Sequence, residues 1–145
     1  MLLPQQRPVR RRRKSSGMPT HPSILVVDSD TGFRRMVKAL IGRHHPHIIV
    51  NEARSQDDAL RQVICFTPGL ILTEIDLSGH RSLDLPRRMR AIYPESVIAV
   101  LTSYDLPEYR EAVFKAGAHH FISKSIPAGP AILAIVKKAL HLSRT

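Results

Sequence analysis

Polar side chains with a shared chemistry follow four of the short apolar runs in this 145-residue chain. Carboxylate oxygens are preferred ligands of magnesium, whereas a hydroxyl group and an ammonium group bind phosphate oxygens. A set that combines all three groups suits a divalent cation bound together with a phosphoryl group. The side chains that follow the runs are Asp28, Ser29 and Asp30; Glu74 and Asp76; Thr102 and Ser103; and Ser123, Lys124 and Ser125.

Five apolar runs predict the strands that must position these side chains. The runs are continuous rather than alternating, so both faces of the predicted sheet should be covered by helices. Helical patterns separate the runs, as expected for a parallel sheet built from crossover units. The predicted fold class is therefore α/β, with a doubly wound five-stranded parallel sheet. Its strands are expected at residues 24–27, 48–50, 70–72, 97–101 and 120–122.

Such a sheet would bring the polar residues to one edge. In open parallel sheets, ligands bind beyond the carboxyl ends of the strands, near the point where the strand order reverses. All four groups of polar residues come directly after a predicted strand. The chemistry of this chain is thus expected at that edge.

Amphipathic patterns predict the helices between the strands. Pro107 is expected in a first helical turn and Gly117 at the end of the same helix. Pro86 implies that the preceding helix begins late, with Asp84 as its cap. Cys65 lies in another helical pattern and is interpreted as a small buried thiol. Two apolar stripes are assigned to the core: Phe33, Met36, Val37, Leu40 and Ile41; and Ile132, Ile135, Val136, Ala139 and Leu140.

The net charge of +10 is concentrated near the start of the chain. Residues 1–22 hold six basic and no acidic residues and almost no periodic apolar pattern, so we predict a disordered basic arm. The arm could contact nucleic-acid phosphates without sequence preference. Residues 23–145 are predicted to form one compact domain, with no further domain expected after its last helix. Translation could start at Met1 or at Met18, and both alternatives stay open.

The sequence gives no sign of a membrane or secretory segment. No apolar stretch approaches the roughly 20 residues needed to span a bilayer, and the first three residues are too few for a signal peptide. A single cysteine excludes a disulfide framework and fits a reducing compartment. We therefore expect a cytoplasmic protein with no membrane partner.

Seven segments of the chain carry a family resemblance. They are Val26-Val27-Asp28, Glu52-Ala53 with Ala59-Leu60, Leu77-Ser78-Gly79, Leu101-Thr102-Ser103, Ala116-Gly117-Ala118 and Phe121-Ile122-Ser123-Lys124. Their order and spacing resemble the receiver domains of bacterial two-component response regulators, over residues 23–142. The resemblance implies a flavodoxin-like fold with strand order 2-1-3-4-5. It also implies that a partner histidine kinase phosphorylates an aspartate, that magnesium bridges the phosphoryl group to the acidic pocket, and that partners read the changed surface.

Three positions depart from the receiver pattern. Glu74 takes the place of the phosphoacceptor aspartate, and its extra methylene group moves the carboxylate toward the position of the phosphoryl group. Because in-line attack is sensitive to shifts of about 1 Å, efficient phosphotransfer to this residue should be lost. Ser29 replaces a direct magnesium ligand, and Ser125 replaces the proline that usually follows the lysine.

Magnesium binding is accordingly expected to be weak or absent. The candidate ligands are Asp28, Glu74 and Asp76. The side chain of Asp76 need not take part, because the family uses a backbone carbonyl group at that position. Asp30 could supply the missing carboxylate, although a role as a helix cap is favoured.

The sequence leaves two roles open for Glu74. Its carboxylate, near Lys124 and Thr102, could hold part of the phosphorylated-like surface permanently, which would make the chain a phosphorylation-independent docking module. Alternatively, Glu74 pairs with Lys124 for stability alone. A conventional phosphoacceptor with a degenerate pocket is a further alternative. The resemblance assigns the aromatic switch position of the family to Phe121.

The resemblance also implies a docking surface near the fourth helix and the fifth strand. Its candidate residues are Leu106, Tyr109 and residues 126–128, and two copies of the chain could pair through this face. Because no output domain is expected, the chain should act through a histidine kinase or a downstream signalling protein. The sequence does not identify that partner, the pathway or the oligomeric state.

A phosphatase that uses a strand-end Asp-x-Asp pair is the alternative from another class. Asp28-Ser29-Asp30 matches that pair, and Thr102 and Lys124 would bind the phosphate. No carboxylates for magnesium follow Lys124, which argues against this alternative. We therefore expect the chain not to be an enzyme.

Overall fold

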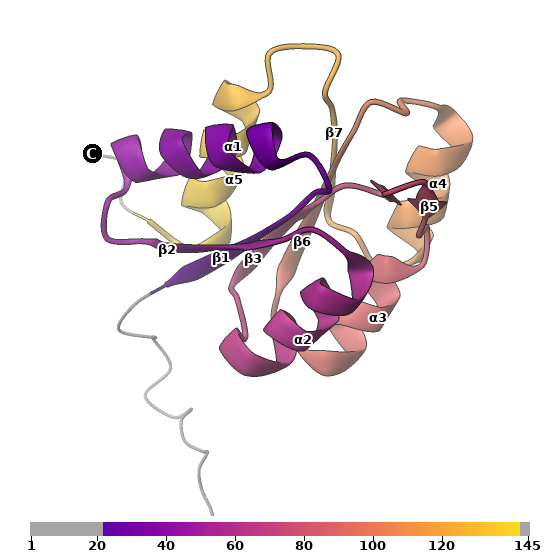
Figure 1. The fold of residues 1–145 in the computed structure, drawn as a ribbon, viewed down its shortest axis with the longest axis horizontal. Coiled ribbons are helices and arrows are strands. Elements are labelled where there is room, and N and C mark those ends of the chain that lie inside the picture. Colours follow the sequence, from indigo (N-terminus) through magenta and orange to yellow (C-terminus); the bar gives the residue numbers. More distant parts are fainter. Residues whose placement is uncertain (1–21, 143–145) are drawn as a thin grey trace, which may run out of the picture.

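Strands and helices alternate along the chain in a computed structural model that describes residues 22–142 (Figure 1). The predictions made for the basic arm, including its disorder, its nucleic-acid contacts and the start at Met18, concern residues 1–21, which lie outside this range; only Pro22 of the predicted arm lies within it. Residues 143–145 also lie outside it. Within the described range, no helix is long and apolar enough to cross a membrane.

Five parallel strands form the central sheet, in the order β2-β1-β3-β6-β7. This is the expected order 2-1-3-4-5, because β4 and β5 belong to a separate small sheet. The order reverses between β1 and β3, which is where ligands bind in open parallel sheets. The strands are β1 (Ser23–Val27), β2 (Ile49–Ala53), β3 (Leu70–Thr73), β6 (Val97–Thr102) and β7 (His120–Ser123).

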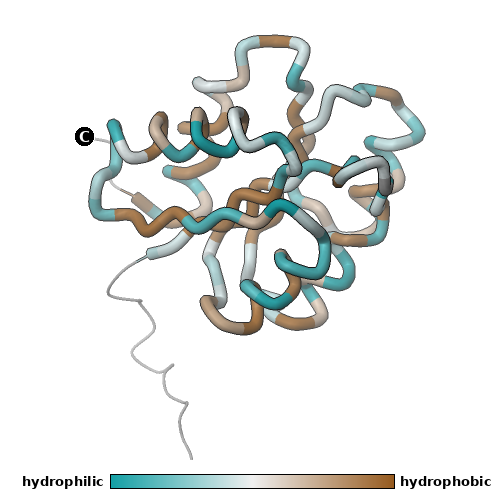
Figure 2. Tube along the Cα trace, viewed as in Figure 1, coloured by the Kyte–Doolittle hydropathy of each residue, from teal (hydrophilic) through white to brown (hydrophobic). Residues whose placement is uncertain are grey.

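Helices cover both faces of the sheet, as its continuous apolar strands require (Figure 1). On one face, α1 and α5 bury Val37 and Ile132 against the sheet. On the other face, α2, α3 and α4 bury Ala59, Met89 and Val113. The strands between them are the most hydrophobic part of the trace in Figure 2. The helices are α1 (Thr31–His44), α2 (Gln56–Phe66), α3 (Leu85–Ile92), α4 (Pro107–Lys115) and α5 (Gly129–Ala139).

Proline and glycine set the helix boundaries largely as predicted. Helix α4 begins at Pro107, and Gly117, with φ of 108°, lies just beyond its end. Helix α3 begins at Leu85 with Pro86 in its first turn, so the late start is confirmed. Asp84 occupies the predicted N-cap position, but its side chain accepts no hydrogen bond from the first turn.

Two side chains that the sequence assigned to the interior are exposed. Cys65 lies at the surface because α2 buries only Ala59 and Val63, and two residues of helix rotate Cys65 by about 200° from Val63. Met36 exposes 47% of its surface for the same reason, one residue before the buried Val37 of α1. The second strand also extends further than the predicted residues 48–50, because its polar half still pairs with β1.

A short hairpin after β3 was not predicted. Strand β4 (Asp76–Leu77) pairs in antiparallel fashion with β5 (His80–Arg81). Ser78 and Gly79 connect them with positive φ values of 56° and 85°, the backbone pattern of a type I′ hairpin turn. The hairpin lies at the carboxyl end of the sheet, beside the candidate site.

Candidate functional site

The carboxyl ends of four strands bring the candidate side chains together. Asp28 follows β1, Glu74 follows β3, Thr102 ends β6 and Lys124 follows β7. Asp28, Glu74 and Thr102 expose 5% or less of their surface. The parallel order of the sheet therefore places two carboxylates, a hydroxyl group and an ammonium group at one nearly dry location.

Lys124 joins the two buried carboxylates. Its Nζ lies 2.6 Å from Oδ2 of Asp28 and 3.0 Å from Oε2 of Glu74. The ammonium group also lies 4.1 Å from the centroid of the Phe33 ring, within range of a cation–π interaction. We call this arrangement of Lys124 between Asp28 and Glu74 the lysine clamp. Burial of the ammonium opposes its charge, but the hydrogen bonds to Asp28 and Glu74 outweigh burial and raise the pKa of Lys124.

The remaining oxygens of the two carboxylates also have partners. Oε1 of Glu74 accepts hydrogen bonds from the backbone N–H groups of Ile75 (2.7 Å) and Asp76 (3.3 Å). Oδ1 of Asp28 accepts a hydrogen bond from the backbone N–H of Asp30 at 2.9 Å. Each carboxylate oxygen of the clamp is therefore occupied by a donor from the same chain.

The other acidic candidates serve the local backbone. The side chain of Asp30 caps α1 by accepting a hydrogen bond from the backbone N–H of Phe33, at 3.2 Å, as the sequence favoured. Asp76 accepts one from the backbone N–H of Gly79 in the hairpin turn, at 3.0 Å. Among residues 22–142, no group of three His, Cys, Asp or Glu side chains is arranged to hold a metal ion.

Thr102 lies in the same pocket but takes part in a different contact. Its hydroxyl oxygen accepts a hydrogen bond from the backbone N–H of Tyr104 at 3.0 Å, and no hydrogen bond joins it to Glu74 in the described part of the chain. Phe121, the predicted switch residue, is partly buried against the core under α4. The centroid of its ring lies 6.5 Å from the ring centroid of Phe114. The guanidinium carbon of Arg110 lies 4.9 Å from the same Phe121 centroid.

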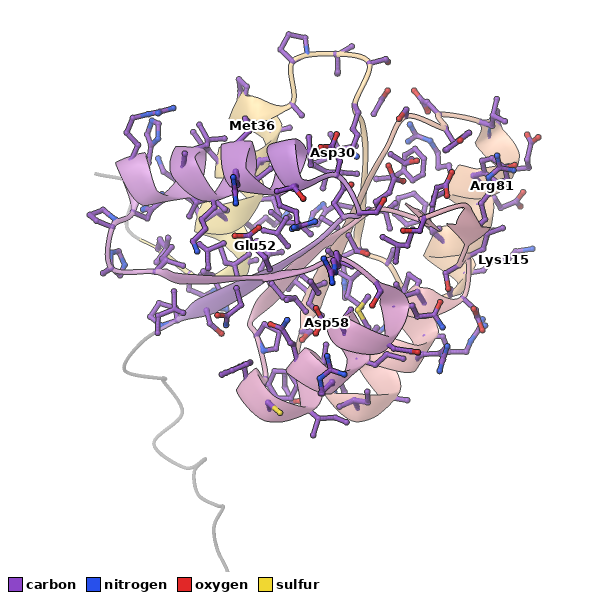
Figure 3. All side chains as sticks on the ribbon, viewed as in Figure 1. Asp30, Met36, Glu52, Asp58, Arg81 and Lys115 are labelled. Carbon is purple, nitrogen blue, oxygen red and sulfur yellow. The ribbon has the colours of Figure 1, made fainter. Side chains whose placement is uncertain are left out.

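The hairpin is fixed to the loops around the pocket. The Oγ of Ser29 accepts a hydrogen bond from the backbone N–H of Ser78 at 3.4 Å. On the other side, Arg81 donates to the hydroxyl group of Tyr109 at 2.9 Å and stacks 4.4 Å from the ring centroid of Tyr104. Figure 3 shows Arg81 beside α4, far along the rim from Asp30. The serine at the predicted magnesium-ligand position thus holds the hairpin instead.

A family model decides the identity of the fold. The model described as the response regulator receiver domain matches residues 24–137, which contain Asp28, Glu74, Thr102 and Lys124. This chain belongs to the response regulator receiver domain family. The resemblance read from the sequence is therefore confirmed, and the receiver domain is a signalling module of two-component systems.

Known relatives agree with this assignment. The transcriptional activator protein ExaE of Pseudomonas putida is 34% identical over 119 residues, which cover 81% of this chain and 54% of that protein. A CheY-like receiver domain from Methanospirillum hungatei JF-1 matches the fold with a TM-score of 0.76 at 22% identity, covering 84% of this chain and 95% of that one. A response regulator from Thermotoga maritima has a TM-score of 0.72 at 26% identity, covering 83% and 98%. This receiver domain spans about half the length of the curated relatives that it matches.

Sequence reasoning missed three side chains that support the pocket of this receiver domain. Phe33 covers the ammonium of the clamp, and Arg81 ties the hairpin to α4. Arg34 is buried in α1 and donates to the backbone carbonyl of Asp28 at 2.6 Å and to the carboxylate of Glu52 at 2.9 Å. Of the three, only the burial of Arg34 could have been predicted from the sequence, because Arg34 lies one helical turn before the buried Val37 on the apolar side of α1.

Proposed function

We propose that this receiver domain signals without phosphotransfer to residue 74 and acts by docking to protein partners. The observation that supports the proposal most is the engagement of both Glu74 oxygens, one by two backbone N–H groups and the other by Lys124. Phosphoryl transfer requires a free nucleophilic oxygen aligned with the donor. The Glu74 carboxylate instead acts as the fixed counter-ion of the lysine.

The lysine clamp also replaces the metal ion in this proposal. Receiver domains typically bind magnesium at the phosphorylation site. The residues present here fit that ion poorly, because Asp28 and Glu74 are bound to Lys124 and Ser29 offers only a neutral hydroxyl group. An incoming magnesium ion would have to displace the ammonium from both carboxylates, which leaves a buried cation without its partners.

We propose that the lysine clamp reproduces part of the arrangement expected in an activated receiver pocket. In the receiver mechanism implied by the sequence, the lysine and the hydroxyl group both close on the new negative charge. Here Glu74 engages Lys124, whereas Thr102 bonds Tyr104 instead. We propose that Lys124 keeps its activated-like contact permanently. Binding of a partner would then determine the conformation of Thr102 and Phe121.

The docking surface that we propose lies over α4 and the loop before α5. Leu106, Phe114 and Ile126 expose 43%, 41% and 60% of their surfaces there. Tyr109, in the same region, is held by Arg81 of the hairpin and so connects this surface to the pocket rim. Apolar side chains exposed together on one face mark a protein interaction site.

Receiver domains interact with histidine kinases and effectors, and regulators of transcription are among the relatives of this chain. For this chain we propose a kinase or a downstream signalling protein as the partner, in the cytoplasm. Pairing of two copies through the α4 surface and non-specific contact of the basic residues 7–14 with nucleic acid are further proposals from the sequence.

An amide-resolved NMR titration of the full chain tests the proposal. Magnesium is added first, followed by beryllofluoride, which mimics a bound phosphoryl group. We expect no shifts at Glu74, Thr102 or Phe121 at millimolar ligand, because the clamp already fills the pocket. Shifts that spread from Glu74 through Thr102 to Phe121 would overturn the proposal in favour of the conventional phosphoacceptor.

Restoring the family residues sharpens the same test. Glu74→Asp withdraws the carboxylate by one methylene group and should loosen its contact with Lys124, while Ser29→Asp returns the missing charge. We expect magnesium and beryllofluoride to bind the double variant E74D/S29D and to bind E74D alone more weakly. Glu111→Asp, on the exposed face of α4, is the matched control and should behave like the wild type.

The phosphatase alternative gains no support from the geometry. Receiver domains are generally signalling modules rather than enzymes. Of the Asp-x-Asp pair, Asp28 is bound to Lys124 and Asp30 caps α1, so neither carboxylate is available as a nucleophile. We expect no hydrolysis of an aryl phosphate beyond that of the Asp28→Asn variant.

A further inference from the structure

The face formed by α2 and α3 leaves two large apolar side chains uncovered. Ile64 of α2 exposes 63% of its surface, and Ile92 of α3 exposes 37%. Both lie near the ends of their helices, and both helices end where the next strand of the sheet begins. Figure 2 shows hydrophobic residues at both helix ends. Apolar side chains gathered on one face in this way require a partner more often than isolated ones.

Contacts of α2 define which of its side chains look toward α3. Gln62 donates to the backbone carbonyl of Glu52 in β2 at 2.7 Å, so this flank of α2 faces β2. Asp57, Leu60 and Ile64 follow one another at helical spacings of three and four residues and share the other flank. Because α2 packs against α3, that flank looks toward α3.

Contacts of α3 define its flanks in the same way. Arg87 donates to the last backbone carbonyl of α4 at 3.3 Å, and Arg90 lies against Gly117 at the turn that follows α4. This flank of α3 therefore faces α4. Arg88 and Ile92, which are four residues apart, lie on the flank toward α2.

The two flanks carry opposite charges that the chain does not neutralise. Asp57 and Arg88 are both exposed, and neither forms an ion pair within residues 22–142. By contrast, the neighbouring Asp58, labelled on α2 in Figure 3, pairs with Arg61 at 2.7 Å. The face thus combines apolar side chains with one free acid and one free base, and it is complementary in charge to a copy of itself.

We propose that this α2–α3 face binds a second copy of the chain. A two-fold axis parallel to the helices places α2 of each copy over α3 of the other, so that both helix pairs run in the same direction. Ile64 of one copy then meets Ile92 of the other. Asp57 lies about 10 Å from Ile64 along α2, and Arg88 lies about 6 Å from Ile92 along α3. The difference between these two distances separates Asp57 of one copy from Arg88 of the other along the helix axis. An arginine side chain leans toward the start of its helix, so Arg88 can span this separation and reach Asp57.

The α2–α3 face is separate from the docking surface on α4 and the loop before α5. A dimer formed through α2 and α3 leaves that docking surface uncovered in both copies. The assembly would present two docking surfaces to partners, which increases the apparent affinity for a partner with two matching sites. Formation of this dimer requires neither phosphorylation of Glu74 nor its contact with Lys124.

Sedimentation velocity of the full chain, from micromolar to millimolar concentration, tests the proposal. We expect a concentration-dependent dimer whose dissociation constant rises about tenfold or more in Ile64→Glu, because a charge is then buried at the centre of the face. Ile126→Glu is the matched control, since Ile126 is 60% exposed on the opposite docking surface and should leave the dimer intact. A monomer at all concentrations, or a dimer lost in Ile126→Glu but kept in Ile64→Glu, would overturn the proposal.

A charge exchange tests the orientation of the two copies. Asp57→Arg and Arg88→Asp should each weaken the dimer, because each places like charges opposite one another. The double variant D57R/R88D restores opposite charges across the two-fold axis and should recover the dissociation constant of the wild type. Circular dichroism confirms that each variant is folded. A double variant that dimerises no better than the single variants contradicts the proposed pairing.

Discussion

The two ends of the central sheet differ in whether their buried polar groups have partners within the chain. At the carboxyl end, Asp28 and Glu74 are buried, and Lys124 binds both of them. At the amino end, the buried Nε of Arg90 has no hydrogen-bond partner among the described residues, and Ile92 of the same helix remains 37% exposed. One end is electrostatically complete, whereas the other leaves polar and apolar groups without partners.

This difference follows from the cost of desolvation. A charge that is removed from water must be paired within the chain, or the protein loses stability. The carboxyl end can therefore be dry only because every charge there has a partner. At the amino end, the buried Nε of Arg90 is the exception to this rule, whereas the exposed Ile92 stays in contact with water and is free to meet another molecule.

Removing Lys124 should break the complete end. Lys124→Met leaves Asp28 and Glu74 buried beside one another without a counter-ion, and we expect a loss of about 3 kcal/mol in the free energy of unfolding. Urea denaturation followed by circular dichroism measures the loss. Lys138→Met, at an exposed position of α5, is the matched control and should change stability little.

The triple variant D28N/E74Q/K124M identifies the cause of that loss. It removes the two carboxylates together with the ammonium, so no unpaired charge remains. We expect most of the lost stability to return. A triple variant that is as unstable as Lys124→Met would mean that packing, rather than charge, dominates at the clamp.

Removing Arg34 should have the second largest effect. Arg34→Met deletes the hydrogen bonds to the backbone carbonyl of Asp28 and to Glu52, and it leaves that carbonyl without its charged donor. We expect a loss of about 2 kcal/mol in the free energy of unfolding, measured by urea denaturation. Arg35→Met, at the exposed neighbouring position, should cost much less. Equal losses in both variants would show that Arg34 contributes only through its helix.

The sequence predicted the sheet and the clamp residues because both depend on strong local patterns. Continuous apolar runs define buried parallel strands, and the topology of such a sheet brings the residues after β1, β3 and β7 together. Asp28, Glu74 and Lys124 could therefore be grouped without coordinates. Their distances, and the absence of a bond between Glu74 and Thr102 in the described residues, could not be predicted, because they depend on rotamers.

The errors fall where the local signal was weak. Cys65 was placed inside because Ile64 beside it is apolar, yet that isoleucine is also exposed. The hairpin was missed because each of its strands has only two residues, too short for any alternation of polarity. Both errors concern stretches that are either exposed or very short, and burial gives no periodic pattern there.

The smallest expected effect concerns His119 at the incomplete end. Its Nδ1 accepts a hydrogen bond from the backbone N–H of Ile98 at 3.0 Å, which requires a neutral ring. Partial burial of the imidazole, followed by the positive charges of Arg90 and His120, lowers the pKa of His119 below its usual value of 6.5. The stabilisation from the neutral ring is therefore complete above that usual value and is lost as the pH falls through the lower pKa of the folded state.

A pH series of unfolding measurements can detect this contribution. Between about pH 7 and pH 5, the wild type should lose a few tenths of a kcal/mol more than His119→Gln, a small difference because solvent screens the exposed ring from Arg90. His141→Gln, at an exposed position after α5, should follow the wild type. If the wild type and His119→Gln lose stability equally over this range, the imidazole is not held neutral. The amino end would then have no titrating group coupled to folding at this position, and the contrast between the two ends would rest on the α2–α3 face alone.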